Sequence, residues 1–145
     1  MIQTAERASS SSTVDNYVFQ RCLFAYHESR ARLGGRVLEI GTGSGLGIEI
    51  LARSCDELVT IDKFDTGIDL GIYPNVKFIR MEIPPLKDLA DNSFDYVLLS
   101  QTLQEAHETV RVLKEALRVG RFVVASFPNF GHWKARFQLL LTGRA

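Results

Sequence analysis

One stretch of the sequence decides the fold: Arg36-Val37-Leu38-Glu39-Ile40-Gly41-Thr42-Gly43-Ser44-Gly45-Leu46-Gly47-Ile48-Glu49-Ile50-Leu51. Its first part is a short apolar run of the kind that a strand covered on both faces requires. The glycines that follow let the backbone turn sharply and leave no Cβ between it and a ligand. Ser44 is the expected N-cap of a helix, which buries Ile48, Ile50 and Leu51. The stretch predicts a strand, a glycine-rich turn and a helix, with backbone N–H groups beside a crevice.

An acidic residue lies where a ribose-binding site needs one. The next apolar run, Leu58-Val59-Thr60-Ile61, ends in Asp62, nineteen positions after Gly43. A carboxylate about 20 positions after a glycine turn is placed to bind the two hydroxyls of a ribose. The dinucleotide pattern G-x-G-x-x-G fails, because Leu46 stands where its last glycine belongs. The spacing therefore predicts a ribose-bearing ligand at a turn that differs from the dinucleotide type.

Length, charge and cysteine content exclude several classes of protein. A chain of 145 residues is long enough for one domain, and its net charge of zero gives no reason to expect nucleic-acid binding. Cys22 and Cys55 stand far apart, so neither a metal site nor a disulfide framework is expected. We find no signal peptide or membrane span, and expect a cytoplasmic protein without a membrane partner. Residues 1–13 are expected to be a flexible leader and residues 14–145 the folded domain.

The rest of the chain predicts helices alternating with strands. A helix over residues 12–33 would precede the first strand, opened by a capping box at Ser12 and Asp15. Further strands are expected at 76–81, 94–99 and 121–127, and a last helix at 131–141. Between the last two strands, helical spacing predicts a surface helix whose buried residues are Leu103, Val110, Leu113 and Leu117. This alternation predicts an α/β fold with a parallel sheet.

Two families resemble this chain. The pattern Glu-x-Gly-x-Gly-x-Gly, which begins at Glu39, resembles the class I S-adenosylmethionine-dependent methyltransferases. Residues 91–104, 117–120, 126–133 and 138–144 resemble MetW, a methyltransferase-like family of methionine biosynthesis. The resemblance implies a Rossmann-like sheet of about five strands in the order 3-2-1-4-5, with helices on both faces and without the usual C-terminal hairpin. Residues 16–85 resemble small-molecule methyltransferases more generally, so a divergent relative and a hybrid of two homologous halves both stay open.

The resemblance also implies S-adenosylmethionine as the cofactor. The residues that it implies as cofactor ligands are Glu39, Gly41, Thr42, Gly43, Gly45, Asp62, Lys63, Glu82 and Ser100. Glu82 would accept a hydrogen bond from the adenine amino group. For the aromatic side chains of the first helix, core packing is favoured over ligand contact, although a sulfonium cation near Tyr17 or Tyr26 would gain from the aromatic face. No metal ligand is expected. The catalytic residues stay unknown, because methyl transfer from an activated donor depends on alignment and needs a base only when the acceptor begins protonated.

Three functions stay open at this point. The first is an enzyme that methylates a small molecule by in-line transfer. The second is a cofactor-binding regulatory module of the MetW type that docks on a homoserine acyltransferase. The third is a fold that has kept its core but has no activity. In all three the strand at 122–127 would be an apolar edge, so we expect a homodimer that forms through this strand.

Overall fold

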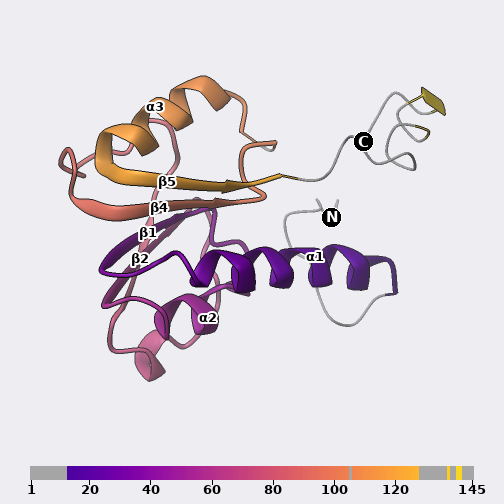
Figure 1. Cartoon of the computed structure of the whole chain (residues 1–145), viewed down its shortest axis with the longest axis horizontal. Coiled ribbons are helices and arrows are strands. Elements are labelled where there is room, and N and C mark those ends of the chain that lie inside the picture. The colour runs from indigo at the N-terminus through magenta and orange to yellow at the C-terminus, as the bar shows by residue number, and fades with distance from the viewer. Residues whose placement is uncertain (1–12, 105, 128–136, 138–139, 142–145) are drawn as a thin grey trace.

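The computed structural model describes residues 13–104, 106–127, 137, 140 and 141, and the fold below refers to these residues. The described residues form five strands and three α-helices (Figure 1); a 3-10 turn separates the second strand from the third, and no helix separates the third from the fourth. In chain order the elements are α1 (Thr13–Arg30), β1 (Arg36–Ile40), α2 (Ile48–Ala52), β2 (Glu57–Asp62), η1 (Leu70–Ile72), β3 (Val76–Arg80), β4 (Phe94–Ser100), α3 (Thr109–Val119) and β5 (Gly120–Ser126).

The strands form one parallel sheet in the order β3-β2-β1-β4-β5. At the centre of the sheet Leu38 pairs with Val59 of β2 on one side and with Val97 of β4 on the other. β3 and β5 are the two edges. The predicted α/β class and strand order are confirmed, and all five carboxyl ends lie at the same end of the sheet because the strands are parallel.

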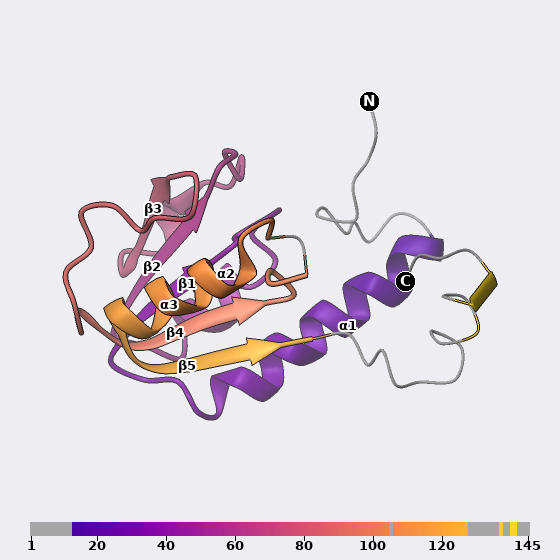
Figure 2. The same ribbon diagram turned by 90° about the horizontal axis from the view of Figure 1, so that it is seen from above.

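Helices cover both faces of the sheet, which gives three layers (Figures 1 and 2). Neighbouring residues of a strand point to opposite faces. Leu38 therefore packs with Ala116 and Val119 of α3 on one face. Val37 packs with Tyr26 of α1 and Leu51 of α2 on the other face. These strand side chains are almost fully buried, and each contributes about 1.5–3 kcal/mol by leaving water.

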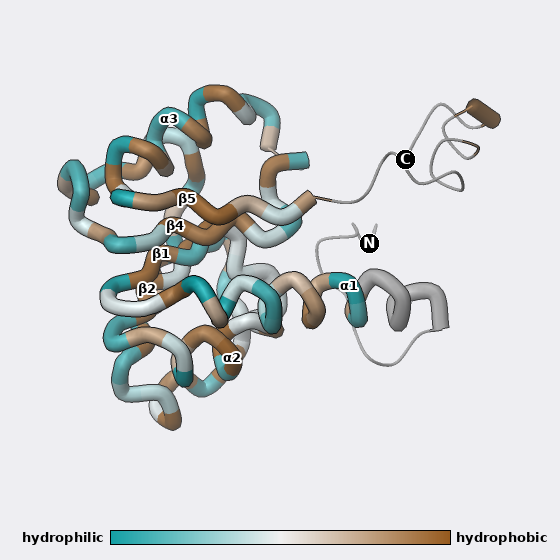
Figure 3. Tube along the Cα trace, viewed as in Figure 1, coloured by the Kyte–Doolittle hydropathy of each residue, from teal (hydrophilic) through white to brown (hydrophobic). Residues whose placement is uncertain are grey.

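The prediction for the buried face of α3 was partly wrong. Val110 and Leu117, both expected to be buried, are 67% and 63% exposed. Leu103 is buried as expected and Leu113 is partly buried, but the buried helical residues are Val112, Ala116 and Val119. The error arose because the helical period was counted from Leu103. The helix begins only at Thr109 and carries both hydrophobic and hydrophilic residues along its length (Figure 3), and its buried residues are spaced as 112, 116 and 119.

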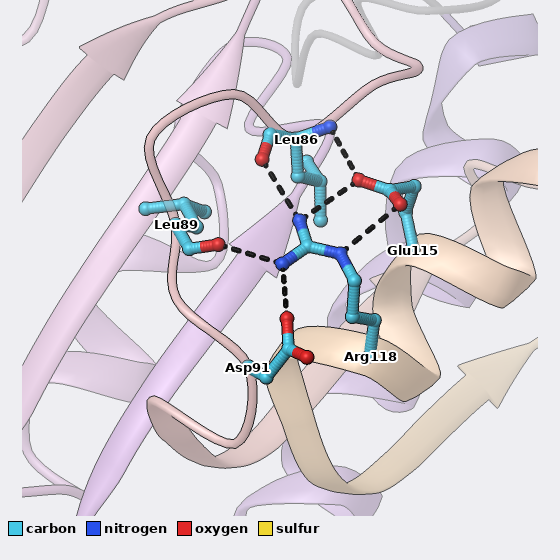
Figure 4. A network of polar contacts seen from close by, with 5 residues as sticks. All are labelled: Leu86, Leu89, Asp91, Glu115 and Arg118. Atoms are coloured by element: carbon cyan, nitrogen blue, oxygen red, sulfur yellow. Dashed lines mark hydrogen bonds and ion pairs between the residues drawn. The ribbon is translucent and has the colours of Figure 1, made fainter.

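The connection between β3 and β4 is tied to α3 by Arg118 (Figure 4). Its guanidinium donates to the carbonyl oxygens of Leu86 and Leu89, at 3.1 and 2.8 Å, and pairs with Asp91 at 2.7 Å. It also pairs with Glu115, one turn earlier on α3, and Glu115 accepts from the N–H of Leu86 at 2.9 Å. The guanidinium holds the pKa of Glu115 below its usual range. This cluster holds the connection against the face that α3 covers.

Two further expectations differ from the structure, and several fall outside it. Ser44 is exposed and does not cap α2, which begins at Ile48 with Gly47 in the N-cap position. The first helix ends at Arg30, three residues before the predicted end. Residues 1–12 of the predicted leader and most of the predicted helix at 131–141 lie outside the described residues, whereas Thr13, the last residue of that leader, begins α1. The expected absence of a C-terminal hairpin concerns the chain after β5, most of which also lies outside the described residues. Among the residues that are described, no helix has the length and apolar character to cross a membrane.

Candidate cofactor site at the carboxyl ends of the strands

The turn between β1 and α2, which we call the glycine loop (residues 41–47), has left-handed backbone at three positions. Gly41, Gly43 and Gly45 have φ angles of 87°, 56° and 78°, which side chains with a Cβ rarely adopt. Gly41 and Thr42 both direct their N–H groups to the carbonyl oxygen of Ile61, at 2.9 and 3.2 Å. The end of β2 therefore holds the start of the loop in place. A Cβ on Gly41 would overlap the side chain of Thr102 and one on Gly45 that of Ile68, so these two glycines leave room for neighbouring side chains.

Asp62 is the residue that connects β2 to this loop. Its Oδ2 accepts the N–H of Gly43 at 2.7 Å, and its Oδ1 accepts the N–H of Phe64 at 2.9 Å. Each carboxylate oxygen has two lone pairs, so each can accept a further hydrogen bond. The carboxylate is partly exposed and is fixed in orientation before any ligand arrives. A pair of adjacent hydroxyls could bind to such a carboxylate.

Glu39 lies beneath the loop and is only 1% exposed. Its Oε1 accepts the hydroxyl of Tyr26 at 2.7 Å, and its Oε2 accepts the hydroxyl of Thr60 at 2.6 Å. The hydroxyl of Thr42, in the loop, is hydrogen-bonded to that of Thr60. Burial raises the pKa of Glu39 and the charge of Asp62 adds to this, whereas the hydroxyls of Thr60 and Tyr26 oppose it. Glu39 therefore supports the loop from below instead of lining the crevice.

Tyr26 of α1 packs on the other end of the same loop. A Cβ added to Gly47 would overlap the Tyr26 ring, so the ring fills the space that this glycine leaves. The side chain is 5% exposed, and burial raises the pKa of its hydroxyl. This placement agrees with core packing, the favoured expectation, and differs from the alternative of an aromatic face turned toward a cation. For Tyr17 the side chain lies outside the described residues.

The remaining predicted site residues lie along the same edge of the sheet. Ser100 ends β4 and is 9% exposed. Lys63 follows Asp62, and its carbonyl oxygen accepts from Arg80 at 3.1 Å. Glu82 is exposed and follows Met81, whose N–H donates to the carbonyl oxygen of Asp62 at 2.9 Å. The structure therefore brings the glycine loop, Asp62 and Lys63 together, with Ser100 on one side and Glu82 on the other.

Thr102 is a loop-supporting residue that the sequence analysis did not select. Its hydroxyl donates to the carbonyl oxygen of Ile40 at 2.7 Å. The same side chain occupies the space where a Cβ on Gly41 would lie. A threonine two residues after a strand has no spacing that would reveal this contact. Of the histidines, His27 and His107 are exposed, and His132 lies outside the described residues.

A groove of about 390 Å³ adjoins these residues between α1 and the carboxyl end of β5. Its walls include Phe24 of α1 and Val124 and Phe127 from β5 and its end. Gln101 lies at its floor with a φ of 58°, which is uncommon for a residue other than glycine. Its N–H donates to the carbonyl oxygen of Ser126 at 3.3 Å. Ser126 also donates to the hydroxyl of Ser100 at 3.4 Å, which places the groove beside the candidate cofactor site.

Comparison with known families matches residues 21–145 to the family described as "Methionine biosynthesis protein MetW". The chain is 46% identical over 55 residues to the bifunctional methionine biosynthesis protein MetXA/MetW of Rhodopirellula baltica. That match covers 38% of this chain and 9% of that protein. A probable S-adenosylmethionine-dependent methyltransferase of Mycobacterium tuberculosis is 29% identical over 132 residues, which is 87% of this chain and 48% of the relative.

Comparison with solved structures agrees on the fold. A protein of Thermotoga maritima, described as a SAM-dependent methyltransferase and possible histamine N-methyltransferase, superposes with a TM-score of 0.60 at 22% identity. The superposition covers 86% of this chain and 63% of that structure. The present chain spans about half the length of the Mycobacterium tuberculosis relative. The family match over residues 21–145 includes the glycine loop and all five strands.

Proposed function

The chain belongs to the MetW family, and from this premise we propose that it binds S-adenosylmethionine at the carboxyl ends of β1, β2 and β4. The observation that carries the proposal is the carboxylate of Asp62, which the N–H groups of Gly43 and Phe64 hold in place for a ribose diol. The relative in Mycobacterium tuberculosis is named for the same cofactor.

The residues present fit this cofactor. The proposed ligands at the loop are the backbone groups of Gly41, Thr42, Gly43 and Gly45, whose three glycines have the positive φ angles that this turn requires. Glu39 acts from below, through Thr60 and Thr42. Lys63 and Glu82 lie on the side proposed for adenine, and Ser100 on the side proposed for the methionine moiety. When bound, the cofactor supplies a methyl group on a sulfonium, which is already activated toward a nucleophile.

We propose the groove beside Ser100 as the site of a small-molecule methyl acceptor. In-line transfer requires the acceptor next to the cofactor, with the reacting atoms about 3–3.5 Å apart. Ser126 joins the groove to Ser100, and the groove combines apolar side chains (Phe24, Val124, Phe127) with charged ones (Arg21, Glu28, Arg32). The protein's contribution would be alignment of the acceptor, so this proposal names no catalytic base.

A regulatory module of the MetW type is the second candidate function. The observation that favours it is the Rhodopirellula baltica relative, whose name joins MetXA and MetW in one bifunctional protein. In that case the present chain would bind the cofactor and dock on an acyltransferase. Cofactor binding is common to both candidates, and only methyl transfer separates them.

The test of function uses S-adenosylmethionine labelled in its methyl group. The chain is incubated with the labelled cofactor and a small-molecule extract of cells, and transfer of label to extract components is measured. An enzyme transfers label, whereas a regulatory module binds the cofactor without transfer. A chain that neither binds nor transfers is the fold without activity.

We also propose that the chain forms a homodimer through β5. β5 is an edge of the sheet, is mostly hydrophobic along its length (Figure 3), and has Phe122 52% exposed. Ser126 directs its carbonyl oxygen toward β4, where it accepts from Gln101. Because backbone groups alternate in direction along a strand, those of Arg121, Val123 and Ala125 point away from β4. Antiparallel pairing of two such edges would satisfy these groups across a two-fold axis.

A further inference from the structure

Four elements meet at the carboxylate of Glu39. Glu39 belongs to β1, Tyr26 to α1, Thr60 to β2 and Thr42 to the glycine loop. Each of these side chains is 5% exposed or less. We call this group of four the hydroxyl network. It connects the loop proposed for the cofactor to a helix on the face of the sheet that α1 and α2 cover.

The donors of the hydroxyl network can be assigned from its contacts. Thr60 has one hydroxyl proton and donates it to Oε2 of Glu39. Thr42 must therefore donate in the hydrogen bond that joins the two threonines. Tyr26 donates to Oε1 of Glu39. When Glu39 is ionised, every proton thus points toward the carboxylate, and both of its oxygens act as charged acceptors.

We infer that Tyr26 is a positioning residue. Together with Thr60 it keeps Glu39 as the anion. The anion, acting through Thr60 and Thr42, holds the glycine loop in the form that binds the cofactor. The inference rests on the proposed function and adds a residue that does not line the crevice. A protonated Glu39 would present a donor to two hydroxyls that already donate to it. One of them would have to turn and accept instead, and the charge-assisted hydrogen bonds that support Thr42 through Thr60 would become weaker neutral ones.

The seating of the Tyr26 ring supports the same inference from a second contact. The ring lies where a Cβ on Gly47 would be, so Tyr26 contacts the last residue of the loop while its hydroxyl reaches Glu39. Thr42, near the start of the loop, is held through Thr60. α1 therefore supports both ends of the loop through one side chain.

The groups that face this site set its response to pH. Two groups act on Glu39 directly: Tyr26 from α1 and Asp62 from β2. Two others act on Tyr26: Cys22, also from α1, and Ser100 of β4, which hydrogen-bonds to its hydroxyl. Burial and the charge of Asp62 raise the pKa of Glu39, and the hydroxyls of Thr60 and Tyr26 lower it. Removing the Tyr26 hydroxyl leaves the burial in place, so the pKa of Glu39 should rise further.

The test measures binding of S-adenosylhomocysteine by calorimetry between about pH 5.5 and 8. Tyr26→Phe keeps the ring and removes the hydroxyl, and its affinity should fall toward acid pH by up to about tenfold per unit, from a higher pH than in the parent. Tyr96→Phe is the matched control, because Tyr96 stacks on Phe122 in β5 instead of the loop. In a Glu39→Gln background, Tyr26→Phe should leave the pH profile unchanged.

A second measurement follows the carboxyl carbon of Glu39 by NMR without ligand. Its titration midpoint should be higher in Tyr26→Phe and in Thr60→Val than in the parent, which keeps the inference testable if Glu39→Gln does not fold. A Tyr26→Phe affinity that falls equally at every pH, or an unchanged Glu39 midpoint, would overturn this inference alone. Absence of binding by the parent at every pH would overturn the proposed function and, with it, the role of Tyr26 in cofactor binding.

Discussion

The N–H of Gly43 donates to Oδ2 of Asp62 over 2.7 Å, between a loop that follows β1 and the last residue of β2. This hydrogen bond joins the two features that the sequence singles out, the glycine turn and the acid nineteen positions later. It also means that the carboxylate does two things at once. It fixes the loop, and it keeps lone pairs for a ligand.

The buried face of α3 is tested by one substitution at two positions. Val112 is 2% exposed and Val110 is 67% exposed, and they lie two residues apart on the helix. We expect Val112→Ala to lower the free energy of unfolding by about 2 kcal/mol, because it removes two buried methyl groups and leaves a cavity. Val110→Ala should change it by less than about 0.5 kcal/mol. Urea denaturation measures both, and equal losses would mean that α3 is turned differently.

The Arg118 cluster should make stability depend on pH. We expect Arg118→Met to lower the midpoint of urea denaturation at pH 7, because it removes ion pairs to Glu115 and Asp91 and hydrogen bonds to two carbonyl oxygens. The pKa of Glu115 is lowered in the fold, so its contribution is present above its unfolded value of 4.5 and is lost as pH falls through the folded value. The difference between variant and parent should therefore shrink below about pH 4.5.

Arg111→Met is the matched control for that cluster. Arg111 pairs with Glu108 on the same helix, and both side chains are more than half exposed. An exposed pair of this kind contributes little to stability. If both variants lose the same stability at pH 7, the connection between β3 and β4 does not depend on Arg118.

A substitution within the glycine loop tests whether the Tyr26 ring packs against Gly47. The φ angle of Gly47 is −80°, so alanine fits its backbone, but the new Cβ would overlap the ring. We expect Gly47→Ala to displace Tyr26 and to lower the thermal midpoint. Gly34→Ala, where a Cβ meets nothing within 4 Å, is the control. A Gly47→Ala protein as stable as the Gly34→Ala protein would show that the ring is not held there.

The edge of the sheet predicts self-association at tens of micromolar. Arg121→Pro should shift the chain toward monomer in sedimentation, because it removes an outward N–H at an exposed position and leaves the pairing with β4 intact. Arg121→Ala removes the same charge but keeps the N–H, so it should associate like the parent. A parent chain that sediments as a stable monomer would contradict the proposal.

Much of the fold could be predicted from short patterns. The apolar runs around Val37, Leu58 and Val97 gave the central strands, since a strand covered on both faces has few other compositions. The phase of α3 could not be predicted, because Leu103 and Ala106, which precede the helix, continue a helical spacing of apolar residues. The N-cap was misplaced for a similar reason: the loop runs on to Gly47, and Ser44 lies within it.

The proximity of the glycine turn and Asp62 was predictable, because their spacing matches that of a ribose-binding site. The hydroxyl network was not, because Tyr26, Glu39 and Thr60 come from separate elements and only folding brings their side chains together. Glu39 was expected to line the cofactor site, but its side chain is buried beneath the glycine loop. Its contribution to cofactor binding is therefore proposed to be indirect.

Calorimetry with S-adenosylhomocysteine on the parent, Asp62→Ala and Asp65→Ala is the most direct test of cofactor binding. Asp65 is a matched control: it is an exposed aspartate three positions on, whose side chain accepts only locally, from Gly67 at 3.0 Å. We expect the parent and Asp65→Ala to bind alike. Asp62→Ala should lose about 2–4 kcal/mol, or tens- to several-hundredfold in affinity, because the ribose loses its charged acceptor. An Asp62→Ala protein that binds as tightly as the parent would contradict the site proposed here.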